Sequence, residues 1–140
     1  VKSRRIARQI ARDGQQAEEI KRPQSLAYSL YNLEAFFALA RMGEAVKVDL
    51  WNYVAPQGGS LKAAFDYAVP ALVGEKTWPH SQQSPPKVER AYPLVAEMMK
   101  AFPTAGCERL MEKISPQHRA LDRAQLYLPA ARGLTGLPRP

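Results

Sequence analysis

An apolar stripe in residues 23–43 constrains the fold of this chain more than any other feature. Within it, apolar side chains recur at spacings of three and four residues, which places them on one face of an α-helix. The stripe consists of Leu26, Leu30, Leu33, Phe37 and Ala40. Proline is favoured at helix starts and glycine at helix ends, so Pro23 and Gly43 mark its limits. The pattern predicts a helix from about Pro23 to Met42 with this stripe buried.

The opposite face of the same predicted helix is aromatic and polar. It carries Gln24, Tyr28, Tyr31, Asn32, Ala35 and Leu39. Two interpretations stay open: the face is the wall of a cleft, or it packs in a second layer with its tyrosine hydroxyls bonded to backbone. Arg22 lies just before this helix, and a guanidinium beside a tyrosine would suit an anionic substrate because it binds carboxylates through two hydrogen bonds. Spacing alone favours a structural tyrosine and a surface arginine.

The remaining segments predict further helices and no convincing pair of strands. The basic segment 1–14 is typical of a helix end that Asp13 and Gly14 stop, and residues 46–59 read as an ordered loop. Ser60 is a typical N-cap residue. Helices are expected over 61–73, 88–102, 105–115 and 116–128, before an irregular tail over 129–140. The predicted fold class is all-α, with antiparallel helical hairpins as the unit.

The composition is that of a globular protein that attracts polyanions. The chain has 140 residues, which suits one all-α domain over 1–140. Its net charge is +7, and such a surface attracts nucleic acid, acidic membranes or acidic polysaccharide. No run approaches the roughly 18 apolar residues of a membrane span, and no nucleic-acid motif accompanies the charge. Neither a membrane nor a nucleic acid is therefore an expected partner.

Metal and nucleophile chemistry find little support in the sequence. His80 and His118 are the only histidines, and neither stands at a ligand spacing. Cys107 is the only cysteine and is expected to be a small buried hydrophobic side chain. The chain contains no glycine-rich phosphate loop and no GxSxG motif. We expect neither a metal site nor a cofactor.

Several motifs occur in an order that carries a family resemblance. They are RRIARQI, then DG, R-x-x-S-x-x-Y-S-x-x-N-L-E, DLWNY, a Gly-Gly-Ser helix start and WP. Over about 4–79 the chain resembles the alginate lyase family of polysaccharide lyases, with little resemblance in the helical extension over 84–140. The resemblance implies part of an incomplete (α/α) toroid, β-elimination on a uronic-acid polymer such as alginate, and a periplasmic or secreted location.

The resemblance also implies roles for individual residues. Tyr28 matches the tyrosine that serves such lyases as acid and often as base, and Arg22 matches the arginine ahead of it. Tyr31, Asn32 and Trp51 fall at positions expected to line the cleft and bind substrate. In that family a group that neutralises the uronate carboxylate acidifies the C5 proton, a base removes this proton, and an acid protonates the departing O4 oxygen.

One departure from the family pattern limits this expectation. The family carries an Asn-His pair upstream of the tyrosine helix, whereas the asparagines of this chain, Asn32 and Asn52, do not precede a histidine. The simplest account is a C-terminal portion of a longer toroid, or a shortened relative, and the expected lyase activity of this chain alone is weak or absent. The alternative is a non-catalytic helical module that binds acidic polysaccharide or a protein partner. The oligomeric state stays open.

Overall fold

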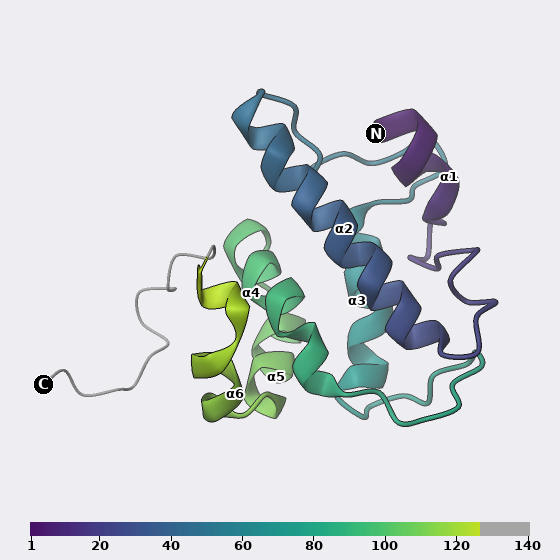
Figure 1. The fold of residues 1–140 in the computed structure, drawn as a ribbon. Coiled ribbons are helices and arrows are strands. Elements are labelled where there is room, and N and C mark those ends of the chain that lie inside the picture. Colours follow the sequence, from purple (N-terminus) through teal and green to yellow (C-terminus); the bar gives the residue numbers. More distant parts are fainter. Residues whose placement is uncertain (127–140) are drawn as a thin grey trace, which may run out of the picture.

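Helices follow one another through residues 1–126, the part of the chain that the computed structural model describes (Figure 1). In chain order they are η1 (Lys2–Ile6), α1 (Ala7–Gln9), α2 (Ser25–Ala45), α3 (Leu61–Leu72), η2 (Val88–Ala91), α4 (Tyr92–Ala101), α5 (Ala105–Lys113), α6 (Pro116–Leu121) and η3 (Arg123–Leu126). Within 1–126, β-pairing is limited to two isolated bridges. The prediction of an all-α fold is confirmed, and the expected tail lies outside the described residues.

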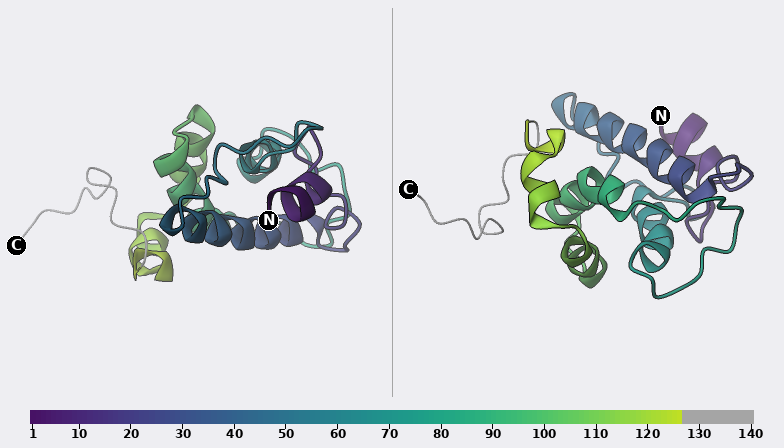
Figure 2. Two further views of the ribbon diagram at one scale, coloured as in Figure 1. Left: turned by 90° about the horizontal axis from the view of Figure 1, so that it is seen from above. Right: turned by 60° about the horizontal axis from the view of Figure 1, so that its bottom comes forward.

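The long helix α2 is the element against which the others pack. It contacts α3 and α4, and α5 contacts α3 and α4 in turn. In Figure 1, α2 and α4 rise towards the upper left, while α3 runs back in the opposite direction. Both views in Figure 2 place the N-terminal helical segment beside α2. Consecutive long helices therefore form the antiparallel hairpins that the sequence predicts.

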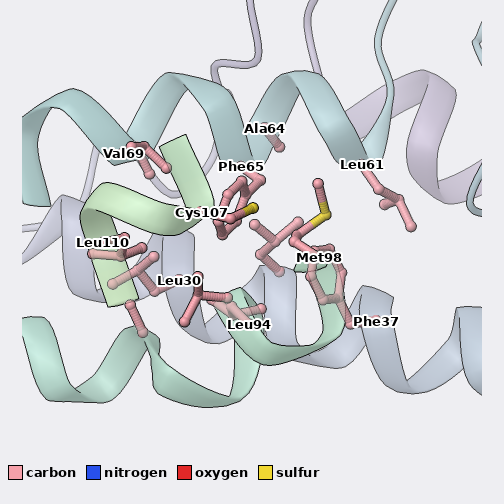
Figure 3. Close-up of a cluster of buried hydrophobic side chains, with 14 of the residues drawn as sticks. Leu30, Phe37, Leu61, Ala64, Phe65, Val69, Leu94, Met98, Cys107 and Leu110 are labelled. Carbon is pink, nitrogen blue, oxygen red and sulfur yellow. The ribbon is translucent and has the colours of Figure 1, made fainter. Parts of the chain in front are cut away.

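The predicted apolar stripe forms the centre of the core. None of its five side chains is more than 4 % exposed. Figure 3 shows Leu30 and Phe37 of α2 facing residues from α3, α4 and α5. The buried partners labelled there are Leu61, Ala64, Phe65, Val69, Leu94, Met98, Cys107 and Leu110. Cys107 is fully buried, so its expected packing role is confirmed.

Three predicted helix ends were wrong. The helix expected over 116–128 breaks at Asp122, whose backbone is extended, into α6 and η3. The N-terminal helix ends at Gln9 rather than at Asp13 because Ile10 adopts extended backbone and pairs with Gln16. Helix α2 continues through Gly43 to Ala45. A Cβ on Gly43 would lie 2.4 Å from the carbonyl oxygen of Val48, so glycine is needed there for the close approach of the following loop.

The structure confirms other features that the sequence predicts near α3. The Ser60 hydroxyl accepts a hydrogen bond from the Ala63 N–H at 3.1 Å and caps α3. Gly74, just after α3, has a left-handed φ of +82°. Residues 46–60 form a loop without strand pairing. No helix within residues 1–126 is long and apolar enough to cross a membrane.

A buried ion pair joins α2 to α4. Arg41 pairs with Glu97, whose residue is only 5 % exposed. Burial raises the pKa of the Glu97 carboxyl, and the hydrogen bond and charge of Arg41 oppose that rise. Because the pKa is raised, Glu97 ionisation works against folding as pH rises above the ordinary glutamate range. The ion pair is therefore weak evidence for stability, because desolvation of the two charges offsets their attraction.

Gly14 and Gly74 provide a matched test of the packing between the N-terminal segment and α3. Both have positive φ, but a Cβ on Gly14 would lie 2.1 Å from the Ala63 carbonyl oxygen, whereas the space around Gly74 is open. Gly14→Ala is expected to lower the free energy of unfolding by about 3 kcal/mol or more, from backbone strain plus overpacking. Gly74→Ala should cost only about 1–2 kcal/mol, from the strain alone. Equal losses in urea denaturation would contradict this packing.

Candidate functional site

Tyr28 and Tyr31 line an open pocket at the first turns of α2. Its volume is about 790 Å³. One wall comes from α2 and consists of Gln24, Ala27, Tyr28 and Tyr31. The other wall comes from the segment before α4 and consists of Gln82, Ser84, Pro85, Pro86, Lys87 and Arg90. The aromatic and polar face of α2 is therefore the wall of a pocket.

The two tyrosines offer their side chains to solvent. Tyr28 is 42 % exposed and Tyr31 is 66 % exposed. Neither hydroxyl forms a hydrogen bond with any residue in 1–126. The alternative of a second packing layer, with these hydroxyls bonded to backbone, is therefore wrong for both residues. Both phenol oxygens are free to bond a ligand.

Arg22 lies against Tyr28. Its guanidinium carbon is 5.1 Å from the centroid of the Tyr28 ring, within the range of a cation–π contact. Its Nε is also 3.9 Å from a carboxylate oxygen of Glu19, a long and weak ion pair. The structure thus brings together three of the residues that the sequence singles out: Arg22, Tyr28 and Tyr31.

A strap from residues 81–84 holds the pocket together. The Ser25 N–H donates to the Ser81 carbonyl at 3.0 Å, and the Gln83 N–H donates to the Pro23 carbonyl at 3.2 Å. These bonds pair the strap with the chain at the start of α2. Residues 84–90 are thereby carried across to face the tyrosines.

Gln82 caps α2 from a distant part of the chain. The first N–H groups of a helix have no partner within it, and the side chain of Gln24, the residue at the cap position, does not supply one. Instead, the Leu26 N–H donates to Gln82 Oε1 at 3.0 Å, across 56 residues of sequence. Gln82 Nε2 donates in turn to Gln24 Oε1 at 2.7 Å and to the Ser84 carbonyl at 2.8 Å. The strap is therefore fixed by side chains as well as by backbone.

A second set of contacts anchors the strap to α3. The fully buried Ser25 hydroxyl accepts from Trp78 Nε1 at 2.7 Å and donates to the Ser81 carbonyl at 2.6 Å. The Tyr67 hydroxyl of α3 lies 2.8 Å from His80 Nε2. The Trp78 ring packs edge-on against both Tyr67 and His80. Sequence reasoning missed Ser25, Tyr67 and Gln82, and only the Trp-Pro motif drew attention to this loop.

Asn32 lies in a polar network beneath the N-terminal segment. Its Nδ2 donates to Gln16 Oε1 at 2.8 Å and to Gln9 Oε1 at 3.3 Å. The Gln16 side chain is buried, and its Nε2 donates to the Ser29 carbonyl at 3.0 Å. Asn32 does not line the Tyr28 pocket. Its contacts secure residues 9–16 to α2, and the predicted role in substrate binding stays a prediction.

Trp51 lies near the opposite end of α2 from Tyr28. Its Nε1 donates to Glu44 Oε1 at 2.8 Å, and its ring packs edge-on against Phe37 at a centroid distance of 4.9 Å. It borders a separate hollow of about 160 Å³ that Arg41 and Glu97 also line. The structure does not bring Trp51 to the tyrosine pocket, and its predicted substrate contact stays a prediction.

Glu34 lies one helical turn beyond Tyr31. Burial raises the pKa of its carboxyl, and the positive charges of Arg90 and Arg123 oppose that rise. Among residues 1–126, no three His, Cys, Asp or Glu side chains gather in a way that could hold a metal ion. What the pocket offers chemically is phenol hydroxyls, amides and cations.

Comparisons with known proteins agree on one family. The family model for alginate lyase matches residues 1–78. The chain is also similar to the crystal structure of an alginate lyase from Bacteroides ovatus, with a TM-score of 0.76 and 24 % sequence identity. That similarity covers 89 % of this chain but 33 % of the other, so the chain spans about a third of that enzyme. A search of curated proteins finds no match.

Ser25 provides a test of the strap. Ser25→Ala is expected to lower the free energy of unfolding by about 1–3 kcal/mol, because it leaves the Trp78 N–H and the Ser81 carbonyl without their partner. Urea denaturation followed by tryptophan fluorescence measures this loss. The control is Ser84→Ala, which removes a more exposed hydroxyl bonded to Gln24 and should change stability by less than about 0.5 kcal/mol. Similar values for the two variants would contradict an anchoring role of Ser25.

Proposed function

The chain belongs to the alginate lyase family, and from this premise we propose that it carries part of the active site of a polysaccharide lyase. The proposed substrate is a uronic-acid polymer such as alginate, cleaved by β-elimination. The observation that carries the proposal is Tyr28, whose hydroxyl is unbonded within residues 1–126 and whose ring lies beneath Arg22 in an open pocket. The family assignment also supports a periplasmic or secreted location and an arrangement of these helices within an (α/α) toroid.

The proposed chemistry assigns one task to each residue. The Arg22 guanidinium binds the uronate carboxylate and withdraws charge from it, which makes the C5 proton easier to remove. In the elimination, the C5–H and C4–O4 bonds break and a C4–C5 double bond forms. Tyr28, acting as its phenolate, accepts the C5 proton and then gives that proton to the departing O4 oxygen, so that its own charge is restored. Tyr31 binds the neighbouring part of the sugar chain.

Tyr28→Phe tests the proposed acid and base. Removing a positioned proton donor typically costs about a hundredfold or more in rate, so formation of the unsaturated product from alginate should fall by at least that factor. The ultraviolet absorbance of this product is the measurement. The control is Tyr53→Phe, which removes a hydroxyl remote from the pocket and should leave the rate unchanged. An unchanged rate in Tyr28→Phe would rule out its catalytic role.

A second candidate function is non-catalytic binding of acidic polysaccharide or of a protein partner. The observation that favours it is in the sequence: neither Asn32 nor Asn52 precedes a histidine, so the Asn-His pair expected of the family is missing from these 140 residues. This candidate predicts salt-sensitive binding of alginate without any product. Product formation that depends on Tyr28 would exclude it.

A further inference from the structure

The wall of the pocket that faces the tyrosines carries two cations. Lys87 and Arg90 both line the pocket and both are exposed. They stand three residues apart, with Lys87 at the N-cap of η2, in extended backbone, and Arg90 within this 3₁₀-helix. The Arg90 N–H donates to the Lys87 carbonyl at 3.1 Å, which closes this turn. The two positive charges therefore belong to one turn of the pocket wall.

Neither cation is neutralised by an acidic side chain within residues 1–126. Lys87 and Arg90 form no ion pair and no side-chain hydrogen bond with any residue in 1–126. None of the residues that line the pocket is acidic. Burial raises the pKa of Glu34, and the positive charge of Arg90 opposes that rise. Glu34 does not line the pocket, however, and it forms no ion pair with Arg90. Within residues 1–126, the pocket thus has positive charge on its wall and no anion to neutralise it.

We propose that Lys87 and Arg90 form a second carboxylate-binding subsite for a polyuronate, on the wall opposite Tyr28. This subsite would hold the carboxylate of a sugar next to the one that Arg22 reaches. The inference rests on the proposed function only in its choice of ligand, because a polyuronate repeats one carboxylate on each sugar. Arg22 lies beside the tyrosine wall, and Lys87 and Arg90 lie on the opposite wall. A polyuronate with at least two sugars would therefore place one carboxylate at Arg22 and the next at the Lys87–Arg90 pair.

The strap gives this subsite its rigidity. Residues 81–84 bond to the start of α2, and Lys87 follows three residues later through Pro85 and Pro86, whose rings restrict the backbone. The distance between the tyrosine wall and the cation wall is therefore set before ligand arrives. Binding of a carboxylate therefore costs less entropy at preorganised cations than at freely moving surface lysines, whose side chains must be ordered on binding.

Equilibrium binding tests the subsite without any need for turnover. Calorimetric titration with size-defined alginate oligomers compares the wild-type chain with Lys87→Gln/Arg90→Gln. We expect binding of a tetramer to weaken by about tenfold or more, and the slope of log K against log salt to fall by about one for each cation removed. Propylene-glycol-esterified alginate, which lacks free carboxylates, should bind weakly and equally to both. Arg90→Lys alone should retain most of the affinity.

A charge-matched control separates the subsite from general attraction. Arg8→Gln/Lys113→Gln removes two exposed cations outside the pocket and produces the same net charge. It should change tetramer affinity by less than about twofold, since exposed charges far from the ligand are screened. An equal loss in both double variants, no loss in the Lys87/Arg90 variant, or no binding by wild type would overturn the inference.

A different measurement, the formation of unsaturated product, tests the proposed function. Tyr28→Phe should abolish product formation, whereas Lys87→Gln/Arg90→Gln should weaken tetramer binding. Suppose that the wild-type chain forms no unsaturated product, and that Lys87→Gln/Arg90→Gln binds the tetramer more weakly than the control variant does. The subsite is then supported, and catalysis by this chain is not. If product forms while the Lys87/Arg90 variant keeps wild-type affinity and KM, catalysis stands and the subsite does not.

Discussion

The cap that Gln82 places on α2 is the interaction on which the pocket depends. A helix start leaves backbone N–H groups without partners, and here one of them is satisfied by an amide 56 residues away in sequence. The same amide bonds back to Gln24. The Gln82 amide therefore joins the tyrosine wall on α2 to the strap that leads to the cations. It acts together with the backbone bonds between residues 81–83 and the start of α2.

The two faces of α2 show how far sequence patterns reach. All five residues that periodicity assigned to the stripe are buried, because burial of apolar area follows helix geometry, although the buried Phe36 was not among them. It also placed Tyr28 and Asn32 on one face, which is correct for the helix but not for their surroundings. Residues 9–16 cover the helix at Asn32 and leave Tyr28 open. Which part of a face is covered depends on tertiary contacts that no spacing within the helix encodes.

The residues that sequence reasoning missed share one property. Gln82, Ser25 and Tyr67 act through hydrogen bonds to residues that are distant in the sequence, and such bonds leave no period in the sequence. The early end of the first helix at Gln9 has a shorter-range cause, because Ile10 is extended and pairs with Gln16. Local signals succeeded where the cause was local, as at the Ser60 cap. The Arg22–Tyr28 contact was within reach of the sequence because Pro23 keeps the arginine beside the helix start.

Charge on this protein acts at two ranges, and the pocket accounts for the shorter one. A net charge of +7 draws any polyanion towards the surface, but it carries no information about which polymer arrives or in what register. Register requires cations at fixed places with no competing carboxylate among them. Lys87 and Arg90 line a pocket that has no acidic residue in its lining, and Arg22 lies against Tyr28 with only a long ion pair to Glu19. Because an exposed tyrosine adds little to the core, Tyr28 and Tyr31 contribute little to stability at these positions, and their exposure leaves both phenols accessible to a ligand.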